Sequence, residues 1–127
     1  MKIVLFDLDG TITDSSEGIV NSIKYALSRL GFPEEPTEKI KQFIGPPLQQ
    51  TFKINYGISD YQNAVAIYRE YYAEKGIYEN RLYDGIVAVL DQLKNEGHII
   101  GLATGKPTYY SHIILKHFKI DHYFNAV

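Results

Sequence analysis

The sequence has no cysteine, no long apolar run and almost no excess of charge. Without cysteine, the chain can form no disulfide, zinc–thiolate site or thiol nucleophile. The longest apolar run near the amino terminus, Ile3–Phe6, is far too short for a signal-peptide core or a membrane span. Thirteen Lys and Arg residues stand against fifteen Asp and Glu residues, and a net charge of -2 argues against the basic face of a nucleic-acid binder. We therefore expect a cytoplasmic enzyme or binding domain with no nucleic-acid or membrane partner.

Tyrosine is the one abundant aromatic residue, and its spacing suggests packing. The chain has eleven tyrosines, and Tyr61, Tyr68 and Tyr72 share a helical face with Val65. Such residues could stack on nucleic-acid bases, but no basic groove accompanies them. Aromatic stripes of this kind usually pack in a core or at an interface.

Two short apolar segments are predicted to form parallel strands. Ile3–Phe6 is a continuous β-prone run, which is typical of a strand buried on both faces. Residues 98–103 form a second run of apolar and small residues, and residues 123–127 could begin a third strand. Polar residues follow the first two runs directly, at the carboxyl ends of strands where α/β sheets bind their ligands.

The segment between these strands is predicted to be helical. Apolar residues at helical spacing indicate a helix that stops at Gly31, and Ser59 could cap a longer helix that ends at Gly76. The order is strand, helical insert, helix, strand, helix and strand, which indicates an α/β fold with a parallel, Rossmann-like sheet. We expect the core at residues 1–14 and 80–127 and a helical cap at residues 15–79.

The strongest chemical signal is the pair of carboxylates just after the first strand. Asp7 and Asp9 are two residues apart, so their like charges favour a cation between them or a raised pKa on one. Oxygen ligands of this kind suit Mg²⁺. One carboxylate could attack an electrophile while the other transfers a proton. The alternative is a polar loop in which aspartate and glycine only form a turn.

The sequence DLDGT at residues 7–11, after an apolar strand, resembles the first motif of the haloacid dehalogenase-like phosphatases. Thr104 resembles that superfamily's second motif, and the helical insert resembles its type C1 cap. The segments at residues 13–15, 44–48 and 103–107 are similar to the phosphoglycolate phosphatase-like branch. The resemblance covers nearly the whole chain. It implies an α/β core with an inserted all-helical cap that closes over the active site.

The resemblance implies a role for each motif residue. Asp7 would be the nucleophile that forms an aspartyl-phosphate, and Asp9 would protonate the leaving alcohol and then activate water. Mg²⁺ would be held by the Asp7 carboxylate and the Asp9 carbonyl. Thr104 would donate a hydrogen bond to the phosphoryl group. Gly10 and Thr11 would fix the loop and present amides to that group, and Gly105 and Lys106 are further candidates for contact with phosphate.

The family's later motifs have no counterpart in the sequence. A lysine and an acidic pair follow the second motif in the family, but this chain ends 23 residues after Thr104, and Asp121 stands alone in a polar turn. Lys106 is a candidate substitute, although another lysine binds phosphate in the branch it resembles. The first strand would also be left as an unpaired apolar edge, which proteins normally avoid.

Three explanations remain open for that edge. The chain could be part of a longer protein, which we favour, or a second copy could cover the edge by self-association. It could also be a degenerate domain without catalysis.

We predict a Mg²⁺-dependent phosphatase acting on a small phosphorylated metabolite such as 2-phosphoglycolate. The alternatives are a 5′-nucleotidase or sugar-phosphate mutase on the same core, or a non-catalytic binding domain.

Overall fold

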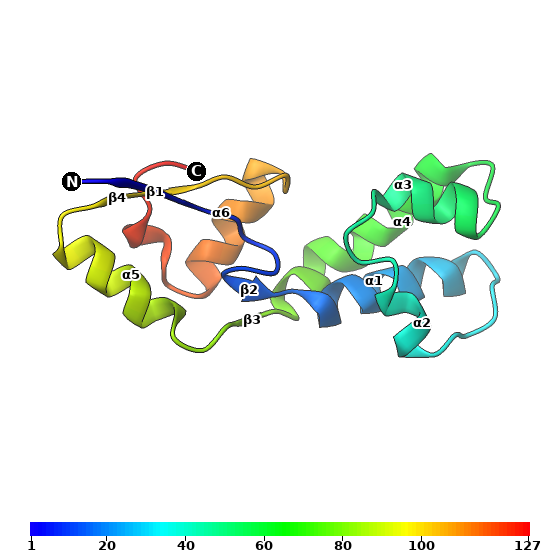
Figure 1. The fold of residues 1–127 in the computed structure, drawn as a ribbon. Helices are drawn as coiled ribbons and strands as arrows, with labels where there is room; N and C mark the ends of the chain where they lie inside the picture. The colour runs from blue at the N-terminus through cyan, green and yellow to red at the C-terminus, as the bar shows by residue number, and fades with distance from the viewer. The chain divides into compact units, whose positions relative to one another are not determined.

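The computed structural model describes all residues 1–127, and they form two compact units (Figure 1). The core unit contains residues 1–15 and 80–127, and the cap unit contains residues 16–79. The cap unit is one continuous stretch of chain, whereas the core unit joins two stretches that are distant in the sequence. The sequence placed the first boundary one residue earlier, between residues 14 and 15.

The core unit is built on two parallel strands. Strands β1 (Ile3–Phe6) and β4 (Ile99–Leu102) pair in parallel, with Ile3 opposite Ile99 and Phe6 opposite Leu102. Two helices, α5 (Ile86–Asn95) and α6 (Thr108–His117), flank β4 in the sequence, so the strands alternate with helices as predicted. This arrangement confirms the predicted α/β class.

A second, very short sheet lies in the same unit. Strand β2 (Thr13–Asp14) pairs antiparallel with β3 (Arg81–Leu82), a pairing that is not predicted from the sequence. The Arg81 guanidinium lies 3.5 Å from the Asp14 carboxylate across this pair. The two stretches of the core unit are therefore joined where the chain leaves for the cap and where it returns.

The predicted burial of β1 on both faces is wrong for the described chain. Ile3 and Leu5 are 68% and 66% exposed, so the face of β1 that carries them is uncovered, and β4 is the only strand that pairs with β1. Ile100 and Leu102 of β4 are buried. Residues 123–127 contribute one bridge rather than a full strand. Ala126 pairs with Gly101, just after the short 3₁₀ helix η3 (Asp121–Tyr123).

The cap unit is entirely helical, as predicted. Its two longest helices, α1 (Ser16–Arg29) and α4 (Tyr61–Glu74), lie side by side (Figure 1). The Asp60 carboxylate caps α4 by accepting a hydrogen bond from the Asn63 amide, in place of the predicted Ser59. Its shorter elements are α2 (Thr37–Lys41), α3 (Leu48–Gln50), the π-helix η1 (Thr51–Asn55) and the 3₁₀ helix η2 (Gly76–Tyr78).

The cap unit has a hydrophobic core of its own. Phe52 and Ile40 are fully buried there with apolar residues of α1 and α4. The first helix also approaches η2 very closely. A Cβ atom at Gly18 would lie 1.9 Å from the Gly76 carbonyl oxygen, so only glycine fits at this crossing. Tyr68 and Tyr72 stack with ring centroids 5.8 Å apart, and Tyr72 is buried, as predicted for a packing stripe.

None of the helices combines the length and the apolar character that a membrane crossing requires.

Candidate active site

Two loops leave the core sheet at the same end, where both of its strands finish. Because β1 and β4 are parallel and in register, their carboxyl ends lie next to each other. The Ala103 amide donates a hydrogen bond of 2.8 Å to the Phe6 carbonyl, which extends the pairing to the first residue beyond β4. Asp7 therefore begins one loop, and Thr104 lies in the neighbouring loop.

Buried apolar side chains anchor the loop after β1. Leu8 and Ile12 are fully buried, and the Leu8 carbonyl accepts hydrogen bonds from the amides of Ile12 and Thr13 at 3.0 and 3.1 Å. The Asp7 side chain is exposed, and its Oδ1 accepts a 2.7 Å hydrogen bond from the Leu8 amide. The loop thus holds one carboxylate at the surface at the end of β1, where a nucleophile would be accessible.

Gly10 shapes the turn that follows. Its φ angle of 80° lies in the left-handed region, which favours glycine. The Gly10 amide donates to the Thr13 carbonyl at 2.8 Å, and the Thr11 amide donates to the Leu8 carbonyl at 3.3 Å. Both amides therefore stabilise the loop. Their binding of a phosphoryl group stays a prediction.

The two loops meet through an ion pair. The Lys106 ammonium lies 3.2 Å from Oδ2 of Asp9, and the Lys106 side chain is only 10% exposed. The Lys106 amide also donates a 3.2 Å hydrogen bond to Oγ1 of Thr104. The structure thus brings three of the predicted site residues together. Gly105 lies between Thr104 and Lys106 in the chain, and its contact with phosphate stays a prediction.

Lys106 is predicted from the sequence as a phosphate ligand, and its contact with Asp9 is not predicted. The relevant signal was present in the sequence. Lys106 lies two residues after Thr104, in a loop that parallel strand order places beside the Asp7–Thr11 loop. This order brings the two loops together, but the paths of the loops decide which of their side chains pair.

The remaining oxygen of Asp9 has no partner. Oδ1 is buried and makes no hydrogen bond, although the Asp9 side chain as a whole is 35% exposed. Buried polar atoms usually have a hydrogen-bond partner. An unpaired acceptor at the carboxyl end of a strand therefore marks a place where a ligand could donate a hydrogen bond.

The donor set suits a hard divalent cation only in part. Asp7 and Asp9 offer oxygen ligands, the kind that Mg²⁺ prefers. No group of three or more acidic, histidine or cysteine side chains that could hold a metal occurs in the chain. Mg²⁺ usually binds one or two carboxylates and takes its other ligands from water and phosphate. The two aspartates fit that incomplete protein shell.

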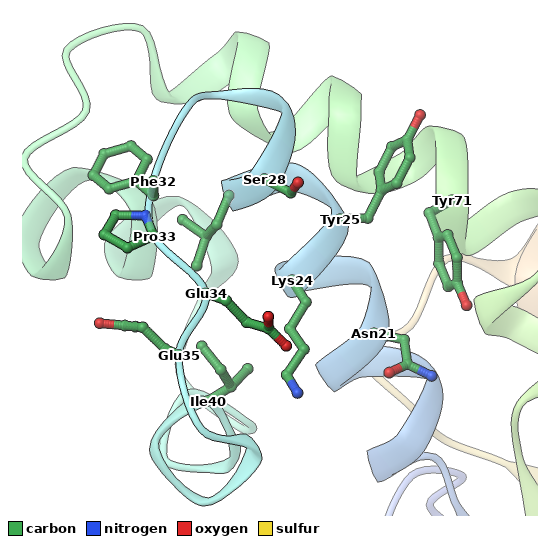
Figure 2. A pocket seen from close by; sticks show the side chains of 11 residues that line it. Asn21, Lys24, Tyr25, Ser28, Phe32, Pro33, Glu34, Glu35, Ile40 and Tyr71 are labelled. Carbon is green, nitrogen blue, oxygen red and sulfur yellow. The ribbon is translucent and has the colours of Figure 1, made fainter.

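A separate cavity of about 470 Å³ lies within the cap unit (Figure 2). Its lining combines apolar rings with charged groups, including Lys24 and Glu34. The Lys24 ammonium donates a 2.7 Å hydrogen bond to the Thr37 hydroxyl. None of the predicted site residues lines this cavity.

Two tyrosine–carboxylate pairs in the cap unit have shifted pKa values. The Glu79 carboxylate accepts a 2.6 Å hydrogen bond from the Tyr71 hydroxyl and raises the pKa of Tyr71 to about 12. Hydrogen bonds from Lys39, at 2.5 Å, and from the Tyr56 hydroxyl lower the pKa of Glu35. Burial and the Glu35 hydrogen bond raise the pKa of Tyr56. Each of these groups has a structural partner, which explains its shift without catalysis.

Comparison with protein families identifies the fold. The family model for haloacid dehalogenase-like hydrolases matches residues 4–127. The chain belongs to this family. In structure it resembles a haloacid dehalogenase-like hydrolase from Streptococcus pneumoniae, with a TM-score of 0.88 and 37% identity over 99% of this chain and 60% of that one. The resemblance noted from the DLDGT motif is thereby confirmed.

Similar proteins of this family have diverse names. The chain is 44% identical to a 5′-nucleotidase of Pseudomonas aeruginosa, 35% to the tyrosine-protein kinase PtkA of Mycobacterium tuberculosis and 33% to a phosphoglycolate phosphatase of Mannheimia succiniciproducens. Each match covers at least 98% of this chain. The chain spans 57%, 43% and 60% of these three relatives, respectively.

Proposed function

We propose that the chain carries the nucleophile and the proton-transfer group of a phosphatase acting on a small phosphomonoester. The observation that supports this most strongly is the 3.2 Å contact between Lys106 and Asp9. Through it, the loop that carries Thr104 reaches the loop that carries both aspartates. Phosphoryl transfer needs an in-line nucleophile and positive charge or hydrogen-bond donors around the phosphoryl oxygens, and these loops can supply them.

In the first step, a carboxylate oxygen of Asp7 attacks the phosphorus atom. A new bond forms between this oxygen and phosphorus, and the bond from phosphorus to the ester oxygen breaks. The departing oxygen takes a proton from the carboxyl group of Asp9 and leaves as an alcohol. The product on the protein is an aspartyl-phosphate at Asp7.

In the second step, water hydrolyses this intermediate. The Asp9 carboxylate accepts a proton from the water as the water oxygen bonds to phosphorus. The bond between phosphorus and Asp7 then breaks, which releases inorganic phosphate. Asp7 returns as a carboxylate and Asp9 as a carboxylic acid, so the cycle closes without another reactant.

We further propose Mg²⁺ as the cofactor. The Asp7 carboxylate and the main-chain carbonyl of Asp9 would hold it, in keeping with the oxygen donors available at this edge. When bound, Mg²⁺ supplies positive charge that offsets the negative phosphoryl oxygens. The Thr104 hydroxyl, which lies in the adjacent loop, is proposed to donate a hydrogen bond to the same group.

Two substrate classes have specific support. A short phosphomonoester such as 2-phosphoglycolate agrees with the 33% identity to a phosphoglycolate phosphatase. A nucleoside monophosphate is the second candidate, because the relative named as a 5′-nucleotidase is 44% identical. Both reactions break a phosphate ester and use the same two aspartates.

The test is phosphate release by the full natural polypeptide that contains residues 1–127. Substrates are 2-phosphoglycolate and adenosine 5′-monophosphate, each with Mg²⁺ and with excess EDTA. We expect turnover that needs the metal. The Asp7→Asn variant should lower kcat by at least about a thousandfold, as loss of a nucleophile does in other enzymes.

The matched control is Asp84→Asn, which makes the same change at an exposed aspartate of the core unit. It should leave kcat unchanged. Full activity in Asp7→Asn would refute the covalent mechanism. A parent protein that is inert toward both esters and toward p-nitrophenyl phosphate would favour the non-catalytic binding domain instead.

A further inference from the structure

The unusual feature of the candidate site is a lysine that is almost buried. The Lys106 side chain is 10% exposed, and its ammonium lies 3.2 Å from Oδ2 of Asp9. Lysine ordinarily keeps its charged end in water, because burying an ammonium group costs free energy unless an opposite charge compensates. An ion pair with Asp9 supplies that compensation.

The main chain around Lys106 is also restrained. Its amide donates to the Thr104 hydroxyl at 3.2 Å, and Pro107 follows immediately, directly before α6 begins at Thr108. The lysine stem therefore starts from an anchored loop rather than from a free one. An anchored stem and a paired ammonium can hold a neighbouring side chain in one conformation.

The two oxygens of Asp9 differ in what they contact. Oδ2 faces the Lys106 ammonium, whereas Oδ1 is buried without a hydrogen-bond partner. An acceptor that is buried and unpaired in the free protein can be satisfied by a ligand O–H group. The departing alcohol and the attacking water both carry such a group.

We propose that Lys106 is a positioning residue for Asp9: it holds Oδ2, so that Oδ1 is the oxygen that exchanges the proton. This inference rests on the proposed phosphatase function and assigns Lys106 a role different from phosphate binding. The lysine acts through Asp9 and touches no reacting atom. Its loss should therefore harm proton transfer to the leaving group and leave phosphoryl binding intact.

Two simple esters separate these roles. p-Nitrophenyl phosphate has a good leaving group that departs without a proton, whereas the phenolate of phenyl phosphate needs one. Neither leaving group is anionic in the substrate, so the two esters bind with the same charge and differ in how far the departing oxygen depends on a proton. The quantity measured is kcat/KM, which reports on the first irreversible step and excludes later hydrolysis of the shared intermediate.

We expect Lys106→Met to lower kcat/KM for phenyl phosphate about tenfold more than for p-nitrophenyl phosphate, a modest part of what general acids contribute. Lys106→Arg, which keeps a cation, should restore most of this ratio. Lys116→Met is the matched control, because Lys116 is an exposed lysine of α6 in the same unit. It should leave the ratio at the parent value.

Equal losses for the two esters would overturn the proposal, since they would mean that Lys106 acts on the phosphoryl group or on the fold. No loss for either ester would overturn it as well. If the parent hydrolyses neither ester, the proposed function has failed, and a structural measurement then decides the role of Lys106.

That measurement is the side-chain conformation of Asp9 from NMR couplings of its β protons, without substrate or metal. One rotamer is expected in the parent and in Lys116→Met, and an average of rotamers in Lys106→Met. A single unchanged rotamer in Lys106→Met would refute the positioning role. Circular dichroism of each variant checks that the fold is retained.

Discussion

The two units of this chain differ in how far apart in the sequence their contacting segments lie. The cap unit is continuous from residue 16 to residue 79 and encloses its own hydrophobic core. The core unit depends on pairing between Ile3–Phe6 and Ile99–Leu102, which lie almost a hundred residues apart. Ordering such a long loop costs entropy before the pairing contributes any stability. The candidate site lies in the unit that depends on this distant pairing.

Exposure of apolar side chains shows the same contrast. Phe52 of the cap unit is fully buried, while Leu5 of β1 is 66% exposed. A parallel sheet is normally covered on both faces, and its edges are normally protected. The core unit thus presents one face of β1 to the outside, whereas the exposed apolar residues of the cap unit, such as Ile54, lie outside its buried cluster.

The largest expected effect tests the independence of the cap core. Phe52→Ala removes a fully buried ring from η1. We expect it to lower the free energy of unfolding by about 3–5 kcal/mol, as other buried phenylalanine-to-alanine changes do. Urea unfolding, followed by the circular dichroism signal of the helices, measures this change in the free energy of unfolding.

The control comes from the same π-helix. Ile54 is 67% exposed, so Ile54→Ala should change the free energy of unfolding by no more than about 0.5 kcal/mol. Similar losses in both variants would mean that the cap core does not determine the stability of this unit. The contrast between the two units would then be lost.

The second prediction concerns the exposed edge of the core unit. If a second copy of the chain covers β1, the second explanation left open by the sequence, Leu5→Lys should weaken this association about tenfold, or about 1.4 kcal/mol, by placing a charge on the pairing edge. Sedimentation velocity over a range of concentrations gives the dissociation constant.

The matched control for this edge is again in the cap unit. Ile54→Lys introduces the same charge at a side chain that is 67% exposed, compared with 66% for Leu5. It should leave association unchanged. A parent chain that is monomeric throughout, or equal weakening by both lysines, would exclude β1 as the interface.

Sequence patterns predicted those features of the fold that have a local cause. The helical cap and the two loops after β1 and β4 follow from periodicity and from polar residues at strand ends. The burial of Ile3 and Leu5 was predicted wrongly, because a strand's own sequence does not reveal which neighbours cover it. The β2–β3 pair was missed because two residues on each side carry too little pattern.

The site was predicted in its residue types but not in all of its contacts. Asp7, Asp9 and Thr104 were chosen from motifs, and parallel pairing places their loops together. The Lys106–Asp9 ion pair depends on the paths of two loops, which residue spacing alone does not define. The Asp60 cap was missed for a simpler reason: serine and aspartate are both good caps, and they occupy adjacent positions.

The smallest expected effect is a pH-dependent contribution of Glu35 to cap stability. This carboxylate accepts hydrogen bonds from Lys39 and Tyr56, which lower its pKa below the ordinary value of a glutamate. A carboxyl group with a lower pKa in the folded state stabilises that state above its unfolded pKa. This stabilisation decreases as the pH falls through the folded value. Removing the charge with Glu35→Gln should therefore lower the melting temperature near neutral pH.

The matched control is Glu34→Gln. Glu34 is exposed and directed away from Glu35, although both residues line the cap cavity (Figure 2). Thermal unfolding is measured at about pH 7 and at an acidic pH low enough to protonate this carboxyl group. The difference between Glu35→Gln and the parent should shrink at the lower pH, where Glu35 becomes protonated, while Glu34→Gln tracks the parent at both. A difference that persists unchanged in acid would assign the effect of Glu35 to packing and not to its charge.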